Sequence, residues 1–371
     1  MAGQGELPRW ATAFALPALN LIAALFVSGL VVLMIGENPI EVVQLLLWGS
    51  FGFGEGIGYT LFYTTNFIFT GLAFAVAFQA GLFNIGAEGQ ASLGGLGVAI
   101  VCLYLDFLPL PILVLVAIAA AGLFGAGWAF VPGWLQARRG SHVVITTIMF
   151  NFIAASVMVY LLVNVMTPEG SMQPESATFA EDARLPFLHD VLGFFGIMIA
   201  KSPANLAFVW ALICCAGFWV LTWHTKLGYE LRTVGANPNA AAYAGMPPDK
   251  LVMIAMSLSG MLAGFMALNE IMGNQHRLIL DFTAGYGFVG IAVALMGRSH
   301  PVGIIFAALL FGALYQGGAE LAFEKPKITR DMVVVIQGLI IFFAGAMEHL
   351  FRPHLQRLLV KSPPNSAEAE A

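Results

Sequence analysis

The stretch TWHTKLGYELRTVGANPNAAAYAGMPPDK, from Thr222 to Lys250, is polar and lies between two long apolar segments. It carries basic and acidic side chains, and Asn237 stands where it can cap a short helix over the alanines that follow. Gly245 and the two prolines at 247–248 end that helix. A helix bent at both ends, too polar for lipid and too ordered for a slack linker, predicts a docking element at a membrane surface.

The composition around this stretch is that of a membrane protein. Of the 371 residues, 59% are hydrophobic and only 10% are charged, and the mean hydropathy is +0.84. A soluble domain carries about a quarter charged residues. Apolar runs long enough to cross a bilayer recur along the chain, which indicates spanning helices and not a barrel. We therefore predict an all-α integral membrane protein.

The apolar runs predict about ten transmembrane helices within a single domain over residues 11–350. A short N-terminus, 1–10, precedes this domain, and a partly disordered tail, 351–371, follows it. Polar breaks near 83–90 and 273–287, one in each half, predict broken helices of the kind that build transport paths. The expected spans cover roughly 11–35, 61–80, 91–105, 111–135, 142–166, 205–223, 251–272, 286–297, 302–320 and 332–350.

The distribution of basic residues predicts the orientation of these spans. With both termini in the cytoplasm, the stretch 222–250 is cytoplasmic, and the more acidic stretches 36–60 and 167–204 lie outside. Only Lys325 and Lys327 do not fit this arrangement.

The sequence contains no recognisable catalytic, nucleotide-binding or metal-binding motif. The sequence has no nucleotide-binding loop, no serine-hydrolase or zinc-protease pattern, and its three cysteines lack metal-ligand spacing. We expect no enzyme activity, no cofactor, no metal and no nucleic-acid partner, so the energy for transport has to come from elsewhere.

The break at 83–90 holds the sharpest polar signal inside the membrane region. Glu88 lies between apolar segments, where an ionisable group is costly unless it is paired or solvated. With Asn84 and Gln90 it can line a water-filled path. Alternatively, the three side chains form a turn near the inner face with a helix-capping role.

Other polar residues within spans pose the same choice. Thr146, Thr147 and Asn151 can line the path, although threonines in membrane helices often bond their own backbone. Glu270, beside Asn269, is expected at the interface near the outer end of its span. The glycines at 260 and 264 predict close helix packing.

Four stretches together resemble the membrane permease subunits of bacterial ABC importers of the branched-chain amino acid, ribose and nucleoside type. In order along the chain they are FNIGAEGQ (83–90), GSHVVITTIMFN (140–151), GYELRTVGAN (228–237) with AAAYAGM (240–246), and GFVGIAVALMGR (287–298). The resemblance extends over roughly 60–350 and is strongest to the longer permease of nucleoside importers, which are loosely described as simple-sugar importers.

This resemblance implies that residues 226–250 dock on a separate cytoplasmic ATPase that binds the ATP. Glu230 and Arg232 would make charged contacts, Gly235, Asn237 and Gly245 would set the bends, and Ala241 lies in the short helix. A second homologous permease and a periplasmic or lipid-anchored binding protein complete the expected assembly, in the lipid of the bacterial inner membrane. The substrate expected is a nucleoside or a simple sugar. The alternative function is an ion- or proton-coupled transporter of a small polar solute.

Overall fold

The structure, a computed structural model, describes residues 16–325 and 327–346 of the chain, and these residues contain helices but no β-strand. The prediction of an all-α protein is confirmed. The termini 1–10 and 351–371 lie outside the described residues. Contacts divide the chain into two compact units, one from Leu47–Gly317 and one from the described parts of Met1–Leu46 and Gly318–Ala371, a division that the sequence did not indicate.

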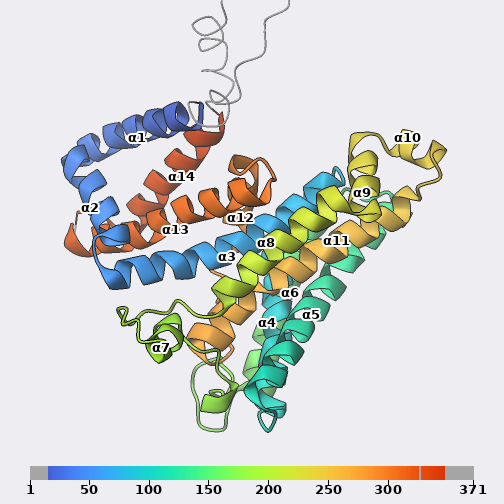
Figure 1. Cartoon of the computed structure of the whole chain (residues 1–371), viewed down its shortest axis with the longest axis horizontal. Helices are drawn as coiled ribbons and strands as arrows, with labels where there is room; N and C mark the ends of the chain where they lie inside the picture. The colour runs from blue at the N-terminus through green and yellow to red at the C-terminus, as the bar shows by residue number, and fades with distance from the viewer. Residues whose placement is uncertain (1–15, 326, 347–371) are drawn as a thin grey trace, which may run out of the picture. The chain divides into compact units, whose positions relative to one another are not determined.

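The first half of the helical order follows the predicted spans, with an added helix in the stretch 36–60. Its helices, shown in Figure 1, are α1 (Leu16–Ile35), α2 (Pro39–Phe51), α3 (Gly54–Gln79), α4 (Ala87–Tyr104), α5 (Leu110–Arg139) and α6 (Val143–Leu161), which the π-helical turn η2 (Leu162–Met166) extends. α5 begins after Pro109 with a proline in its first turn and ends at Gly140, whose φ of 68° closes the helix.

The second half begins with the long irregular stretch that was expected between 167 and 204. It contains only η3 (Glu181–Ala183) and α7 (Leu188–Phe194). The helices that follow are α8 (Ala207–His224), α9 (Lys226–Ala236), α10 (Pro238–Tyr243), α11 (Pro248–Gly264) with the π-helical η4 (Leu268–Gln275), α12 (Tyr286–Met296), α13 (Pro301–Glu324) and α14 (Arg330–Ala346).

Among the described residues, six helices are long and apolar enough to cross a membrane, or seven if the bent pair of α1 and α2 is one span. The bend between those two helices is 115°. The remaining predicted spans coincide with shorter or less apolar helices, such as α12 with 11 residues. The count of ten spans and their orientation stay predictions.

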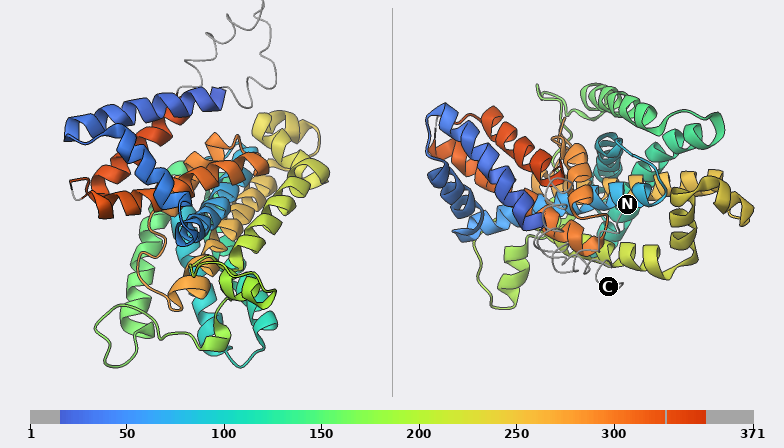
Figure 2. Two further views of the ribbon diagram at one scale, coloured as in Figure 1. Left: turned by 60° about the vertical axis from the view of Figure 1, so that its left-hand side comes forward. Right: turned by 90° about the horizontal axis from the view of Figure 1, so that it is seen from above.

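The core of the Leu47–Gly317 unit is formed by α3, α4, α5 and α11, which lie side by side (Figures 1 and 2). α5 and α11 approach each other through glycines, as predicted. A Cβ placed on Gly260 would overlap the carbonyl oxygen of Gly125, and one on Gly264 would overlap that of Ala121. Small residues allow this backbone contact, in which van der Waals packing and not the hydrophobic effect joins the helices.

In the other unit, the two lysines that did not fit the predicted orientation are paired with acids. Lys325 Nζ lies 3.2 Å from a Glu37 carboxylate oxygen and 2.9 Å from one of Glu41, and Lys327 Nζ lies 3.6 Å from Glu37. Glu37 and Glu41 belong to the acidic stretch 36–60. The loop after α13 and the corner between α1 and α2 therefore lie together, and their charges largely cancel.

Candidate functional site

The stretch 222–250 contains two helices where the sequence predicted one. Thr225 caps α9: its hydroxyl accepts a hydrogen bond from the Gly228 amide at 3.1 Å. Asn237 caps α10, as predicted, because its side-chain oxygen accepts from the amides of Asn239 at 3.0 Å and Ala240 at 3.1 Å. Gly245, with φ of 79°, ends the short helix.

One face of this stretch is anchored in the protein. Leu231 and Val234 of α9 and Ala241 of α10 are buried in a core with residues from α3, α11 and the start of α6. Gly235 sits so close to the turn after α3 that a Cβ would overlap the Gln79 carbonyl oxygen. α9 and α10 are therefore packed directly against α3 and α11, in a core that is not freely deformable.

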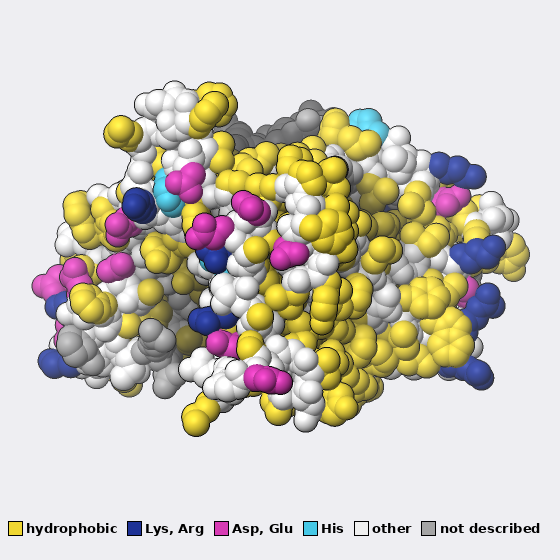
Figure 3. Space-filling model, turned by 90° about the horizontal axis from the view of Figure 1, so that it is seen from below, with side chains coloured by type: hydrophobic (Ala, Val, Ile, Leu, Met, Phe, Trp, Pro, Cys, Tyr) yellow, Lys and Arg dark blue, Asp and Glu magenta, His cyan; other side chains and the backbone are white. Residues whose placement is uncertain are grey.

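The opposite face is open. Tyr243 is 94% exposed, and the side chains of its neighbours Ala242 and Ala244 are exposed as well. Figures 1 and 2 show α9 and α10 in yellow at one end of the helices of this unit. In Figure 3, Lys and Arg side chains gather at the right-hand end, where Figure 1 draws α9 and α10.

Two ion pairs take up part of the charge at this end. Lys226 Nζ lies 3.6 Å from a Glu230 oxygen within α9, and Arg138 lies 3.5 Å from Asp249, which joins the end of α5 to the start of α11. Glu230, predicted to contact a partner, is thus paired within its own helix. Arg232 takes part in none of the ion pairs found among the described residues.

The break at 83–90 is held by a buried hydrogen-bond network. The Asn84 amide donates to Gln90 at 3.0 Å and to the Ser259 hydroxyl at 2.8 Å, and Ser259 in turn donates to the Ala73 carbonyl at 2.6 Å. These bonds connect the break to α3 and α11. Asn84, Gln90 and Ser259 are each at least 99% buried.

The polar residues of α6 hold the same break from the other side. Thr147 bonds the Val143 carbonyl of its own helix, as the structural alternative predicted, and also accepts from the Ile85 amide at 3.3 Å. Asn151 accepts from the Gly89 amide and donates to the Ile85 carbonyl, both at 2.9 Å. Thr146 bonds only backbone carbonyls of its own segment.

Glu88 joins the two polar breaks. Its carboxylate accepts from the Gly285 amide at 2.7 Å and from the Gly287 amide at 2.8 Å. It therefore caps the N-terminus of α12, where a negative charge is favourable. The capping role considered from the sequence is present, but the capped helix is remote in the chain.

A second buried network was not predicted. The Asn66 amide donates to Glu270 at 2.6 Å, Asn269 donates to the Asn66 oxygen at 2.8 Å, and Asn205 donates to Asn269 at 3.0 Å. Glu270 is only 4% exposed, so the protein encloses its side chain, while its depth in the membrane stays a prediction. The π-helical backbone of η4 turns this side chain inward, and the signal in the sequence was the Asn269-Glu270 pair inside an apolar run.

Three tyrosines form an aromatic cluster, and one of them, Tyr286, lies near both Glu88 and Glu270. The rings of Tyr63, Tyr286 and Tyr315 have centroids 5.8–6.2 Å apart, and Phe67 contacts the last two at 5.5 and 5.0 Å. They bring α3, α12 and α13 together. No sequence pattern marked this cluster, because the three rings come from distant segments.

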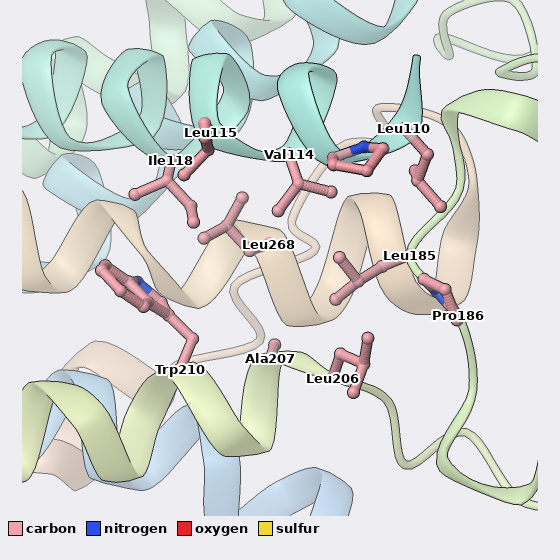
Figure 4. A pocket seen from close by; sticks show the side chains of 11 residues that line it. Leu110, Val114, Leu115, Ile118, Leu185, Pro186, Leu206, Ala207, Trp210 and Leu268 are labelled. Carbon is pink, nitrogen blue, oxygen red and sulfur yellow. The ribbon is translucent and has the colours of Figure 1, made fainter. Parts of the chain in front are cut away.

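A separate pocket of about 310 Å³ has an apolar lining (Figure 4). It lies between α5, α8 and η4, beside the stretch 167–204. The indole N–H of Trp210 is buried there without a hydrogen-bond partner. An apolar lining without charged groups does not suit a polar solute. The labelled lining residues are Leu110, Val114, Leu115, Ile118, Leu185, Pro186, Leu206, Ala207, Trp210 and Leu268.

The described residues contain no cluster of three His, Cys, Asp or Glu side chains that could hold a metal. Cys102 and Cys215 are buried free thiols, and Cys214 is a half-buried one.

A helical membrane protein with two interlocked polar breaks and an anchored surface helix pair has the architecture of a transporter subunit. Residues 56–345 match the family model described as branched-chain amino acid transport system / permease component, and the chain belongs to this family.

Relatives with curated names agree with this family. The chain is 34% identical to the Guanosine ABC transporter permease protein NupP of Bacillus subtilis, over 89% of this chain and 92% of that protein. It is 31% identical to the Glucose ABC transporter permease protein TsgB13 of Haloferax volcanii, over 98% and 95%. It is 30% identical to the Nucleoside ABC transporter permease protein NupB of Lactococcus lactis, over 88% and 89%.

The family settles the class of protein. The chain is a multi-pass membrane permease subunit of an ABC transporter and is not itself an enzyme, because ATP hydrolysis belongs to a separate ATPase subunit. A substrate-binding protein is the other partner that the importer family implies. The ion-coupled alternative loses its support.

Proposed function

We propose that this chain forms the translocation path for a nucleoside, or for a simple sugar, across a bacterial inner membrane. Of the relatives above, two carry nucleoside or guanosine in their names and one carries glucose, each over nearly its whole length. The two substrate classes share a hydroxyl-bearing ring. A nucleoside adds a planar base, for which exposed faces of aromatic side chains offer stacking partners.

The path is assigned to the place where the two breaks meet. Glu88, Thr146 and Asn151 are half-buried there and would border the path. Asn84, Gln90 and Thr147 are buried and would hold its wall through the hydrogen bonds described above. Polar groups that converge on interrupted helices are what a transport path through lipid requires.

Residues 226–250 are assigned as the coupling element for the ATPase. The observation that carries this assignment is that one face of α9 and α10 is fixed in the core, while the other presents exposed side chains around Tyr243. An element built in this way can receive a force at the surface and pass it to the helices of the path.

A second, homologous permease is proposed to complete the path, and the binding protein is proposed to dock on 36–60 and 167–204. Co-purification of the expressed importer with a tag on this chain tests both. A pair of identical permeases in the purified complex would refute the heterodimer.

Uptake of tritiated guanosine into cells that express the complete importer tests the substrate. We expect unlabelled nucleosides to compete and unlabelled glucose or ribose to compete weakly. Transport of sugar with no transport of guanosine would overturn the nucleoside preference.

Tyr243→Asp tests the coupling element. We expect less co-purified ATPase and less uptake, because a charged, shorter side chain replaces the most exposed ring of α10. Met172→Asp is the matched control for ATPase retention alone, since Met172 is fully exposed (101%) in the stretch proposed to dock the binding protein and not the ATPase. If both variants bind ATPase like the parent chain, the coupling assignment is wrong.

A further inference from the structure

Two pockets of about 310 Å³ each adjoin near the place where α5 and α8 begin. One is the apolar pocket of Figure 4, and the other is a charged pocket formed mainly by the segment 181–190 with His276. The two linings have Leu110, Leu185 and Pro186 in common. A single molecule can therefore occupy both pockets, with an apolar part in one and a polar part in the other.

The apolar pocket lies along the first turns of two candidate spans. α5 and α8 are both long and apolar enough to cross a membrane. The lining extends only from Leu110 to Ile118 on α5, about 12 Å along the helix axis, and it includes Ala207 and Trp210 from the start of α8. Leu115 is 67% exposed, so the pocket opens on the outer surface of the helices. This is the position of a lipid chain just inside a membrane boundary.

The charged pocket lies at the same end of α5 but is built from segments outside the spans. Asp190 has a partner, His189, at 3.5 Å. Glu181, Asp182 and Arg184 take part in none of the ion pairs found among the described residues. Side chains of both signs thus face the depth at which lipid headgroups lie. The ionisable residues of the lining are Glu181, Asp182, Arg184, Asp190 and His276.

This arrangement of charges suits a zwitterion that carries an ammonium group. Arg184 is half-buried, and its Nε and Nη2 donate to the Phe179 carbonyl at 3.2 and 3.0 Å, which fixes a guanidinium group in the wall where it can bind a phosphate. Glu181 and Asp182 are exposed directly before it and can bind an ammonium. Acids outnumber bases in the lining, which disfavours a headgroup with a net negative charge.

We propose that the two pockets bind one membrane phospholipid with an amine headgroup. Its acyl chain lies in the apolar pocket, its phosphate beside Arg184 and its ammonium beside Glu181 and Asp182. Lipid tails are as apolar as leucine, so the apolar pocket contributes shape and the charged pocket selects the headgroup. The proposal requires that α5 and α8 span the membrane, and it does not depend on the substrate or on the coupling element.

The bound lipid would brace the second buried network. Leu206 and Leu268 line the apolar pocket, and each is next in sequence to an asparagine of that network. The side chains of these asparagines, Asn205 and Asn269, are hydrogen-bonded at 3.0 Å. A lipid chain packed against both leucines therefore supports the contact between the start of α8 and η4.

The test uses the complete importer in nanodiscs with equal amounts of phosphatidylethanolamine and phosphatidylglycerol. After a brief detergent wash, native mass spectrometry identifies the lipids that stay bound, and we expect phosphatidylethanolamine to predominate. Val114→Trp fills the apolar pocket and should lower bound phosphatidylethanolamine about tenfold. Leu123→Trp places the same ring on α5 outside the pocket, at a position that is 72% exposed, and should change it less than about twofold.

The headgroup is tested by a charge reversal. Glu181→Lys should lower the ratio of bound phosphatidylethanolamine to phosphatidylglycerol about fivefold, because a lysine there repels the ammonium and attracts the anionic lipid. The control Glu169→Lys makes the same reversal at an exposed position outside both pockets and should leave the ratio unchanged. Hydrogen exchange of α3 and α11 checks that all variants are folded.

Three results would overturn the proposal. Bound lipids that match the bilayer mixture and do not respond to Val114→Trp would show only a layer of bulk lipid around the protein. Variants that keep their lipid but lose the binding protein would show that the charged pocket docks a protein. Loss of lipid in Val114→Trp with an unchanged ratio in Glu181→Lys would exclude the amine headgroup. Because the readout is bound lipid, a failure of guanosine uptake leaves this proposal untouched.

Discussion

Glu88→Gln tests whether one carboxylate holds the start of α12. In the parent chain the two carboxylate oxygens each accept one amide, from Gly285 and from Gly287. A hydrogen bond to a charged acceptor contributes roughly 1.5–3 kcal/mol. Glutamine keeps one oxygen, but its NH₂ group faces the second amide and leaves that N–H unpaired. We expect the local opening free energy at 285–287 to fall by about 2 kcal/mol.

The assay is hydrogen–deuterium exchange of the detergent-solubilised protein, followed in peptides that cover 283–290. A loss of about 2 kcal/mol should speed their exchange about 30-fold. The control is Glu230→Gln: Glu230 pairs only with Lys226 within one helix, a kind of contact that contributes about 0.5 kcal/mol or less. Equal exchange at 283–290 in the two variants would refute the cap as a source of stability.

The same variant separates structure from transport. If Glu88 borders the path, uptake by Glu88→Gln should fall further than the amount of folded protein in the membrane. A fall in uptake that matches the fall in folded protein would leave Glu88 with a structural role only.

Three further outcomes are expected. Gly125→Ala should destabilise the protein by about 1–3 kcal/mol, because its Cβ would overlap the Gly260 carbonyl. The control Gly127→Ala should be neutral or stabilising, because no atom lies within 4 Å of its Cβ. Equal melting temperatures of the two variants would contradict this prediction. Gly235→Ala should displace α9 from the turn after α3 and reduce ATPase stimulation by substrate, and unchanged stimulation would show that the contact is not needed. Burial lowers the pKa of His276 from its ordinary 6.5, so the folded state resists protonation of this side chain. The free energy of unfolding should therefore fall as the pH drops below about 6.5 and level off below the lowered pKa. A His276→Gln variant with the same pH profile would show that His276 is not the source of this pH dependence.

The helices were largely predictable because apolar runs and caps are local. Each predicted span contains a helix, and Asn237 caps α10 as its position indicated. α9 was missed because its helical periodicity is short. Its stability comes from burying Leu231 and Val234 against other segments, which a local pattern does not report.

The sequence predicted which polar residues belong to the candidate site, but not which residues they bind. Glu88, Asn84 and Asn151 stood out as polar residues in apolar surroundings. Their partners depend on tertiary contacts, such as Glu88 with Gly285 at a separation of 197 positions. The enclosure of Glu270 by the protein was not predicted, because hydropathy alone does not show which way a π-helical turn directs a side chain.

The length of α12 gives the Glu88 cap a further meaning. At 1.5 Å per residue its 11 residues extend only about 16 Å, roughly half the hydrocarbon thickness of a bilayer. Its first residues, Tyr286 and Gly287, are buried within the protein, and Glu88 of α4 is the hydrogen-bond partner of the Gly285 and Gly287 amides. Any movement that separated α4 from α12 would leave the backbone N–H groups of Gly285 and Gly287 without this hydrogen-bond partner inside the protein. The two helix starts should accordingly travel as one rigid block through the transport cycle, and the flexing that opens the path must be sought elsewhere in the chain.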